Sequence, residues 1–184
     1  MNIDIKKRTE LFLRVLKKFP EFRYLGDPIL RTPTQSVDIT EGAEIGSRLG
    51  GILVKYRQIA GIGRGLAAPQ IGISKSVFVT YLDDEIQTYI NPKIISSSQS
   101  NNSYRELCLS CGTMWVDIKR PEIINLQWTN KAGGKQEKEF TGLVARLIQH
   151  EYDHLQGIPN FDKAEAGTIE FVTSDPLAQK LRSI

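Results

Sequence analysis

Two histidines four residues apart, with a glutamate between them, constrain this chain more than any other feature of its sequence. Residues 142–156 carry apolar side chains at roughly helical spacing, which predicts a helix. Residues four apart lie on the same face of a helix, so His150 and His154 can point two imidazoles at one metal ion. Glu151 lies one position round the helix, close enough to contact a ligand of that ion. This H-E-x-x-H arrangement combines two metal ligands with a carboxylate for proton transfer.

The identity of the third ligand decides what kind of metal site this helix can build. The metzincin pattern has a third histidine where this chain has Asn160, which is a poor ligand. Glu165 or Glu170 could complete a site of two histidines and one glutamate, but neither stands in a clear second helix. Cys108 is the stronger candidate. One thiolate and two imidazoles leave the fourth position of a tetrahedral site open for water, as a catalytic site requires.

A closed structural zinc site is the competing interpretation of the same residues. Cys108 and Cys111 form a C-x-x-C pair, which could join the two histidines in a Cys₂His₂ site. However, 38 residues separate Cys111 from His150, against about 12–15 in the usual zinc-finger pattern. A closed site would also leave Glu151 without a purpose, and a chain of 184 residues does not need a metal in order to fold.

Length, charge and cysteine content exclude several classes of protein. We expect one catalytic domain over residues 1–184. The net charge of +3 includes no long basic block, so recognition of nucleic acid is not indicated. No apolar run approaches the roughly 18 residues that span a bilayer, and the N-terminus lacks the apolar core of a signal peptide. Two cysteines make no disulfide framework, which favours a reducing compartment and predicts a cytoplasmic location.

Hydrophobic periodicity predicts an α+β domain with antiparallel or mixed sheets packed around the helix that carries both histidines. Residues 1–20 are predicted to be a basic helical extension that packs on the domain rather than serving as a docking surface. Cap residues before Glu41 and the glycine-rich stretch from Gly61 delimit a second helix. Residues 96–103 are expected to form a polar loop, and 161–184 a tail with a short helix near 177–181. Strands are predicted over residues 77–82, 88–90, 93–95, 115–119, 122–129 and 136–140.

The stretch from Gly63 to Gln70 has the composition of a ligand-binding loop. Gly63 and Gly65 allow the backbone to approach a ligand closely, and Gln70 offers an amide donor. The stretch is not a phosphate-binding loop, because it lacks the Gly-Lys-Ser/Thr ending. A tight turn entering the next strand, with Gln70 on the surface, explains the same residues equally well when they are considered alone.

Three stretches together resemble the peptide deformylase family, whose members remove the N-formyl group from new polypeptides. That family carries the motifs G-x-G-x-A-A-x-Q, E-G-C-L-S and Q-H-E-x-D-H in this order. The chain has G-R-G-L-A-A-P-Q at 63–70, E-L-C-L-S at 106–110 and Q-H-E-Y-D-H at 149–154. The resemblance covers roughly residues 24–160. Three ordered motifs at plausible spacing are highly specific.

The resemblance implies a metal held by Cys108, His150 and His154. The usual ion of the family is Fe²⁺, whereas the ligand set alone would suggest Zn²⁺, and Ni²⁺ is a further alternative. A water activated by the metal would attack the formyl carbon while Glu151 transfers the proton. The oxyanion would be stabilised by the metal, by the side-chain amide of Gln70 and by the backbone N–H of Leu109. The products would be formate and a free amine.

The substrate implied by the resemblance is an N-formylmethionyl peptide, with the ribosome surface as a further partner. The walls of a methionine pocket are expected from Val144 and Leu147, with Ile148 beside them, and the peptide would pass Gly63 and Gly65. Two residues depart from the family pattern. Leu107 replaces the glycine between Glu and Cys, and Arg64 stands where an aliphatic residue is usual. A positive charge at Arg64 could favour acidic residues after the formylmethionine or could simply point to solvent.

Two alternatives and two supporting residues complete the predictions. Leu107 and Arg64 also suit an amide hydrolase of the same scaffold that acts on another N-formyl or N-acyl compound. A binding module stabilised by its metal, without activity, is the second alternative. Glu106 and Asp153 are expected to hydrogen-bond the ring N–H groups of the metal-binding histidines. Asp153 could instead pair with Arg120 or Arg146.

Overall fold

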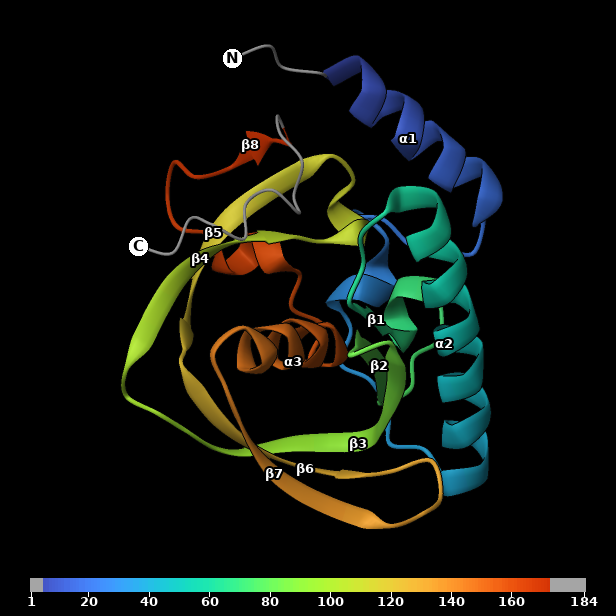
Figure 1. The fold of residues 1–184 in the computed structure, drawn as a ribbon, viewed down its shortest axis with the longest axis vertical. Helices are drawn as coiled ribbons and strands as arrows, with labels where there is room; N and C mark the ends of the chain where they lie inside the picture. Colours follow the sequence, from blue (N-terminus) through green and yellow to red (C-terminus); the bar gives the residue numbers. More distant parts are fainter. Residues whose placement is uncertain (1–4, 173–184) are drawn as a thin grey trace.

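The computed structural model describes residues 5–172 and has the predicted α+β architecture (Figure 1). The short helix predicted near 177–181 lies outside the described residues. The helices are α1 (Ile5–Lys18), α2 (Ile39–Ala60) and α3 (Gly142–Leu155). The strands are β1 (Gly65–Ala67), β2 (Val77–Leu82), β3 (Glu85–Ser97), β4 (Asn101–Leu107), β5 (Met114–Pro121), β6 (Ile123–Thr129), β7 (Lys135–Thr141) and β8 (Glu170–Phe171).

Two antiparallel sheets enclose α3, the helix that carries both histidines. One sheet has the strand order β1-β2-β3-β6-β7, and the other has the order β4-β5-β8. In Figure 1 α3 crosses the centre of the molecule, with β4 and β5 on one side of it and β3, β6 and β7 on the other. Most of the functional residues of the helix are therefore buried, although they are polar.

The sheets contain more strand than the sequence predicts. β3 runs through Pro92 without a break, and register shifts beside β6 absorb the proline. The prediction of a polar loop over 96–103 is wrong at both ends, because β3 continues to Ser97 and β4 begins at Asn101 and pairs along its length with β5. The first residues of β4 are polar and partly exposed, so their local composition resembles that of a loop. Pairing with a distant strand overrides that local preference.

A stripe of glycines brings α2 into close contact with β3. Gly42, Gly46 and Gly50 are four residues apart on one face of the helix, and each is buried. A Cβ at these positions would lie 2.7 Å from Ile90, 2.3 Å from Thr88 and 3.0 Å from Ile86 respectively. Four helical residues rise about 6 Å, and two strand residues about 6.6 Å, so the two spacings match. The glycines that weaken the helix locally thus permit its packing.

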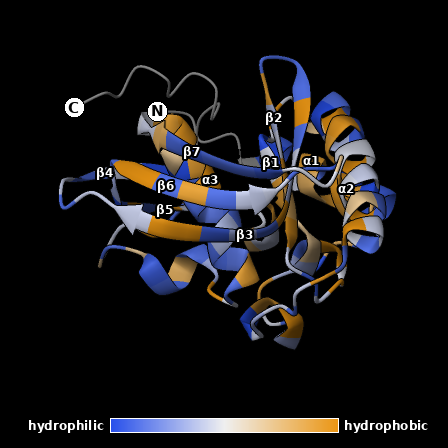
Figure 2. Ribbon diagram, turned by 90° about the horizontal axis from the view of Figure 1, so that it is seen from below, coloured by the Kyte–Doolittle hydropathy of each residue, from blue (hydrophilic) through white to orange (hydrophobic). Residues whose placement is uncertain are grey.

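Side chains from α1 and α2 fill the first of two hydrophobic clusters, and α3 contributes to the second. Hydrophilic and hydrophobic residues alternate along α2 in Figure 2, as expected for a helix with one face on a sheet. The basic α1 is anchored by Val15, and Phe19 just beyond its end stacks on Phe22 with ring centroids 4.8 Å apart. Within residues 5–172, no helix is long and apolar enough to cross a membrane.

Candidate active site

Cys108, His150 and His154 come together at the centre of the molecule. Their ligand atoms all lie within 4.8 Å of one another, and the three residues are buried. The two histidines are one turn apart on α3, and Cys108 lies between the end of β4 and a short 3-10 helix, Leu109–Cys111. The Cys108 Sγ lies 3.3 Å from Nε2 of His154. Cys108 lies more than 40 residues before the histidines in the sequence. The pairing of β4 with β5 next to α3 brings it close to them.

Glu106 orients one imidazole of this cluster. Its Oε2 lies 2.8 Å from Nδ1 of His150, which leaves Nε2 of that ring to face an ion. Arg120 contacts both oxygens of Glu106, at 2.6 and 3.0 Å, and Arg146 contacts Oε1 at 2.6 Å. Burial alone would raise the pKa of Glu106, but the hydrogen bonds from His150 and Arg120 outweigh it and hold that pKa well below its usual range.

Asp153, which the sequence left with several alternative partners, pairs with Arg120. The distance from Arg120 Nη1 to the Asp153 carboxylate is 2.6 Å, and Lys163 Nζ lies 2.6 Å from the other oxygen. Arg120 is 2% exposed, so its charge must be neutralised by these carboxylates. The buried network therefore links β4, β5 and α3 behind the cluster. The sequence offered Arg120 and Arg146 as alternative partners of Asp153, and the structure selects Arg120.

Glu151 is buried beside the loop that precedes β1. Its Oε2 makes no hydrogen bond with any of the described residues, and burial raises the pKa of Glu151 to about 7. A Cβ at Gly65 would lie only 2.2 Å from Oε1 of Glu151. Gly65 is thus required for the position of this carboxylate. The sequence assigned Gly65 to close approach by a ligand, and the close approach in the structure is that of Glu151.

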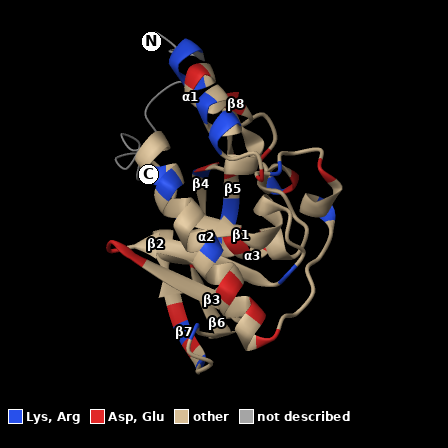
Figure 3. Ribbon diagram, turned by 90° about the vertical axis from the view of Figure 1, so that its right-hand side faces the viewer, with Lys and Arg blue, Asp and Glu red and all other residues tan. Residues whose placement is uncertain are grey.

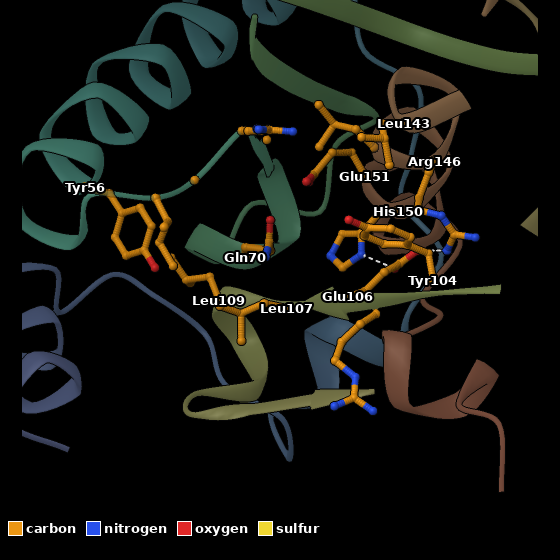
Figure 4. A pocket seen from close by; sticks show the side chains of 16 residues that line it. Tyr56, Gln70, Tyr104, Glu106, Leu107, Leu109, Leu143, Arg146, His150 and Glu151 are labelled. Carbon is orange, nitrogen blue, oxygen red and sulfur yellow. Dashed lines mark hydrogen bonds and ion pairs between the residues drawn. The ribbon is translucent and has the colours of Figure 1, made fainter. Parts of the chain in front are cut away.

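The side chain of Gln70 is held with its amide nitrogen toward the cluster. Its Oε1 accepts a hydrogen bond of 2.8 Å from the backbone N–H of Ala67. This fixes the orientation of the amide, whose Nε2 lies 3.2 Å from Ser110 Oγ and 3.7 Å from Cys108 Sγ. Gln70 is buried, so the alternative of a surface glutamine is excluded. Figure 4 shows Gln70, Glu151 and His150 converging on the same part of the cavity.

A cavity of about 250 Å³ opens next to Glu151 and His150. It is lined by most of the residues predicted to bind substrate: Gly63, Arg64, Gly65, Leu107 and Leu147. Gln70 and Leu109, the predicted oxyanion donors, line it as well. Val144 is placed elsewhere. It packs against the second hydrophobic cluster, because one helical step from Leu143 rotates its side chain toward the sheet. Leu143, four residues before Leu147, lines the cavity instead, and the helical spacing of the two leucines is the signal that could have identified it.

Aromatic and basic side chains that the sequence did not assign to the substrate cavity complete the wall. They are Tyr56, Tyr104, Arg105 and Arg146. Tyr56 comes from α2, and its ring packs so closely on Gly63 that a Cβ at Gly63 would lie 2.9 Å from it. The other three come from β4 and α3. These residues lie far apart in the sequence, so only the folded chain brings them together.

The closed site that the C-x-x-C pair suggested is not formed. Among the described residues, the potential metal-binding group contains Cys108 but not Cys111. The Cys111 Sγ lies 2.9 Å from Oδ1 of Asn160 instead. The pKa of Cys108 lies well below its usual value because of the adjacent Cys111 thiol and the charges of the two imidazoles. A sulfur that readily becomes a thiolate and two imidazoles fit a divalent transition metal with one position open.

Known proteins are similar to this chain in sequence and in fold. The sequence model of the family described as polypeptide deformylase matches residues 20–168. The peptide deformylase of Treponema pallidum (strain Nichols) is 34% identical over 145 residues, which are 79% of this chain and 88% of that protein. The peptide deformylase of Prochlorococcus marinus (strain NATL1A) is 39% identical over 144 residues, covering 76% of this chain and 70% of that protein.

Solved structures give the same result. The crystal structure of peptide deformylase from Thermotoga maritima is 32% identical, with a TM-score of 0.71, and covers 78% of this chain and 96% of that one. The peptide deformylase from Synechococcus elongatus, in complex with actinonin, is 36% identical with a TM-score of 0.70 and covers 78% of each chain.

The fold and the cluster on α3 define a metal-dependent amide hydrolase with an H-E-x-x-H helix. Within that class, the chain belongs to the polypeptide deformylase family, which removes the N-formyl group from new polypeptides. The family recognised from the three sequence motifs is therefore confirmed. α1 precedes the matched residues and is not part of that comparison.

Proposed function

We propose that this chain deformylates N-formylmethionyl peptides at the cavity beside α3, with Cys108, His150 and His154 as metal ligands. The observation that carries this proposal is the buried group of one sulfur and two imidazoles next to Glu151. When bound, the cation supplies Lewis-acid activation of the attacking water and of the formyl oxygen. The ion proposed is Fe²⁺, with Zn²⁺ and Ni²⁺ as alternatives that metal analysis of protein purified without oxygen would distinguish.

Glu151 is the general base and acid of this proposal. Its carboxylate takes a proton from the water that attacks the formyl carbon, and then delivers a proton to the departing nitrogen as the C–N bond breaks. Formate and a free amine result, so no other reactant is needed. Burial of Glu151 and a pKa of about 7 support this role, since a group that titrates near neutral pH can both accept and donate.

Gln70 and Leu109 stabilise the oxyanion that forms on the formyl oxygen. The amide of Gln70 is already fixed by Ala67, so its N–H groups need no reorientation during the reaction. Leu109 follows the proposed ligand Cys108 directly in the sequence and lines the same cavity. Removal of one donor of this kind costs about 2.7–4 kcal/mol of transition-state stabilisation. Gln70→Ala should therefore lower kcat much more than it raises KM.

The methionine side chain is proposed to enter the part of the cavity lined by Leu143, Leu147 and Tyr104. These residues are apolar or aromatic and lie on α3 and β4, next to the proposed base. Leu107 also faces this cavity, at the position where the family has glycine. Peptides whose residue after methionine is bulky should therefore be poorer substrates. Leu107→Gly should improve their kcat/KM more than it improves that of peptides with alanine in this place.

Formate release from formyl-Met-Ala peptides tests the proposed activity. Metal-loaded protein should release formate, and Glu151→Gln should lower kcat by about 10²- to 10⁴-fold. The substitution replaces one oxygen by nitrogen, so the metal content should be unchanged. Cys108→Ala should lose the metal, whereas Cys111→Ala should keep it. Turnover of other N-acyl compounds, but of no formyl-Met peptide, would favour the alternative hydrolase.

We propose the ribosome surface as a docking partner, through a basic groove between α1 and α2. Arg14, Lys17, Lys18 and Lys55 line this groove and are exposed. Figure 3 shows basic residues along α1 and at the adjoining end of α2, and acidic residues at the other end of α2. The surface of a ribosome is polyanionic, and a basic groove suits it through charge alone, without recognition of a nucleic-acid sequence. Val15 of α1 is buried in the first hydrophobic cluster, with Leu11 packed against it. Docking through the exposed basic residues of α1 therefore goes beyond the packing role that the sequence favoured.

Sedimentation with ribosomes at increasing salt tests this docking. Lys17→Glu/Lys18→Glu should abolish co-sedimentation, whereas Lys131→Glu/Lys135→Glu, on the exposed β6–β7 turn, should leave it intact. An equal loss in both variants would mean unspecific attraction of charge. A cytoplasmic location is proposed on two grounds, a substrate made by ribosomes and the two free cysteines. Fractionation of cells with an antibody to the chain would test it.

A further inference from the structure

Three arginines line the active-site cavity, and two of them are paired with carboxylates of the protein itself. Arg105 contacts Asp117 through Nε and Nη2 at 2.7 and 3.1 Å, and Glu170 through Nη1 at 2.7 Å. Arg146 contacts Glu106 and the carbonyl oxygen of Ile118 at 2.6 and 2.9 Å. Both guanidinium groups are therefore held by partners within the protein.

Arg64 is the third arginine, and its charge is unmatched. Its side chain is exposed, and it forms no hydrogen bond or ion pair with any described residue. Its backbone is fixed, because its carbonyl oxygen accepts a 2.7 Å hydrogen bond from Tyr81 N–H. The next residue is Gly65, which adjoins the carboxylate of Glu151. Arg64 therefore has a fixed backbone and an unpaired guanidinium group, and it directly precedes the glycine that contacts the proposed base.

We propose that Arg64 gives the enzyme a preference for substrates with an acidic residue close behind the formylmethionine. This inference rests on the proposed function. A peptide whose first residue fills the cavity must leave through its mouth, where Arg64 is the positive charge that no neighbour compensates. A carboxylate in the second or third residue of the peptide supplies the missing partner. An aliphatic residue at this position would offer no such contact.

The size of the preference follows from exposure. Exposed pairs of arginine and carboxylate contribute little, because water screens them, so kcat/KM for an acidic peptide should exceed that of its neutral analogue by about twofold to fivefold. The advantage should shrink as salt is raised toward about 1 M, where the Debye length falls to about 3 Å. A basic residue in the same place should be disfavoured to a similar degree.

Competition between matched peptides tests the inference. Formyl-Met-Glu-Ala and formyl-Met-Ala-Glu are each compared with the peptide that has glutamine in place of glutamate, all amidated at the C-terminus. The ratio of kcat/KM, glutamate over glutamine, is measured for the unaltered enzyme, for Arg64→Gln and for Arg64→Glu. Lys93→Gln is the control, because Lys93 is an exposed cation on β3 that does not line the cavity.

The expected result is a ratio above one for at least one of the two peptide pairs in the unaltered enzyme and in Lys93→Gln. The ratio should be close to one in Arg64→Gln and below one in Arg64→Glu. Equal ratios in the unaltered enzyme and Arg64→Gln would overturn the proposal, as would an equal fall in Lys93→Gln. Calorimetry with the Glu151→Gln protein gives the dissociation constants of the same peptides, and hence the preference for glutamate over glutamine in binding, without turnover. Absence of formate release would contradict the proposed function. The calorimetric comparison would still decide whether Arg64 selects acidic peptides.

Discussion

α2 and α3 are packed against sheets of the same domain but are buried in different ways. The buried residues of α2 are all glycine or aliphatic, whereas those of α3 are mostly polar or charged. In α2 they are Gly42, Ile45, Gly46, Leu49, Gly50 and Leu53. In α3 the polar ones are Arg146, Gln149, His150, Glu151, Asp153 and His154. One helix is held by close contact, and the other by a network of charges between two sheets.

The difference teaches where this protein exchanges stability for chemistry. Burying a charged group costs free energy unless partners satisfy it, and α3 buries several. Arg120 and Glu106 provide the partners, so the network holds the histidines in place rather than adding stability of its own. α2 carries no such groups and needs only shape. Substitutions that disturb the packing of α2 should lower stability, whereas substitutions around α3 should affect charge compensation or activity.

Arg120→Met should cause the largest loss of stability. It leaves the carboxylates of Glu106 and Asp153 without their shared partner inside the protein, so the free energy of unfolding should fall by about 3–5 kcal/mol. Urea unfolding at equal metal loading measures it. Arg105→Met is the control, since the side chain of Arg105 is 22% exposed and its loss should cost about 1 kcal/mol. Equal losses would contradict the distinction between buried and exposed charge.

Gly65→Ala should damage activity more than folding. The added methyl group would lie 2.2 Å from Oε1 of Glu151, so the carboxylate must move. A displacement of about 1 Å can lower the rate by about 10²-fold, equivalent to about 2.7 kcal/mol of transition-state stabilisation. The measurement is kcat/KM for formyl-Met-Ala peptides together with the metal content. Unchanged activity would show that Glu151 need not occupy this position.

Gly46→Ala should destabilise the protein although alanine favours helix. A Cβ there would lie 2.3 Å from Thr88 Cγ2, and such overpacking costs about 1–3 kcal/mol. Gly51→Ala is the matched control on the same helix, because nothing lies within 4 Å of its added Cβ. It should stabilise the protein by up to about 1 kcal/mol through helix propensity. Thermal unfolding of both variants measures these effects. Equal changes in stability would show that Gly46 is not needed for close packing against Thr88.

The smallest effects are expected at the N-caps of the two helices. Asp38 accepts a 2.9 Å hydrogen bond from the N–H of Glu41 at the start of α2, and Asp38→Ala should cost about 1 kcal/mol. Thr141 precedes α3 and makes no such bond through its side chain. Thr141→Ala should therefore change the free energy of unfolding by less than about 0.5 kcal/mol. A larger loss at Thr141 than at Asp38 would reverse this order.

Much of the fold could be predicted from the sequence because its signals are local. The cap at Asp38, the end of α2 near Gly61 and the apolar spacing of α1 depend on residues a few positions apart. β4 could not be predicted in this way, because its polar start is stabilised by pairing with β5. Pro92 likewise gave a false break in β3. Strand pairing joins distant residues, and a single sequence does not display that pairing.

The sequence by itself determined the pair of imidazoles and the carboxylate between them, since helical periodicity alone places His150, Glu151 and His154. Only the tertiary structure decided the rest of the site. It selected Arg120 as the partner of Asp153, turned the amide of Gln70 toward the cluster, and left Arg64 without a neutralising neighbour. The physical reason is that charge compensation and side-chain orientation depend on which distant residues share a buried space, and only folding determines that.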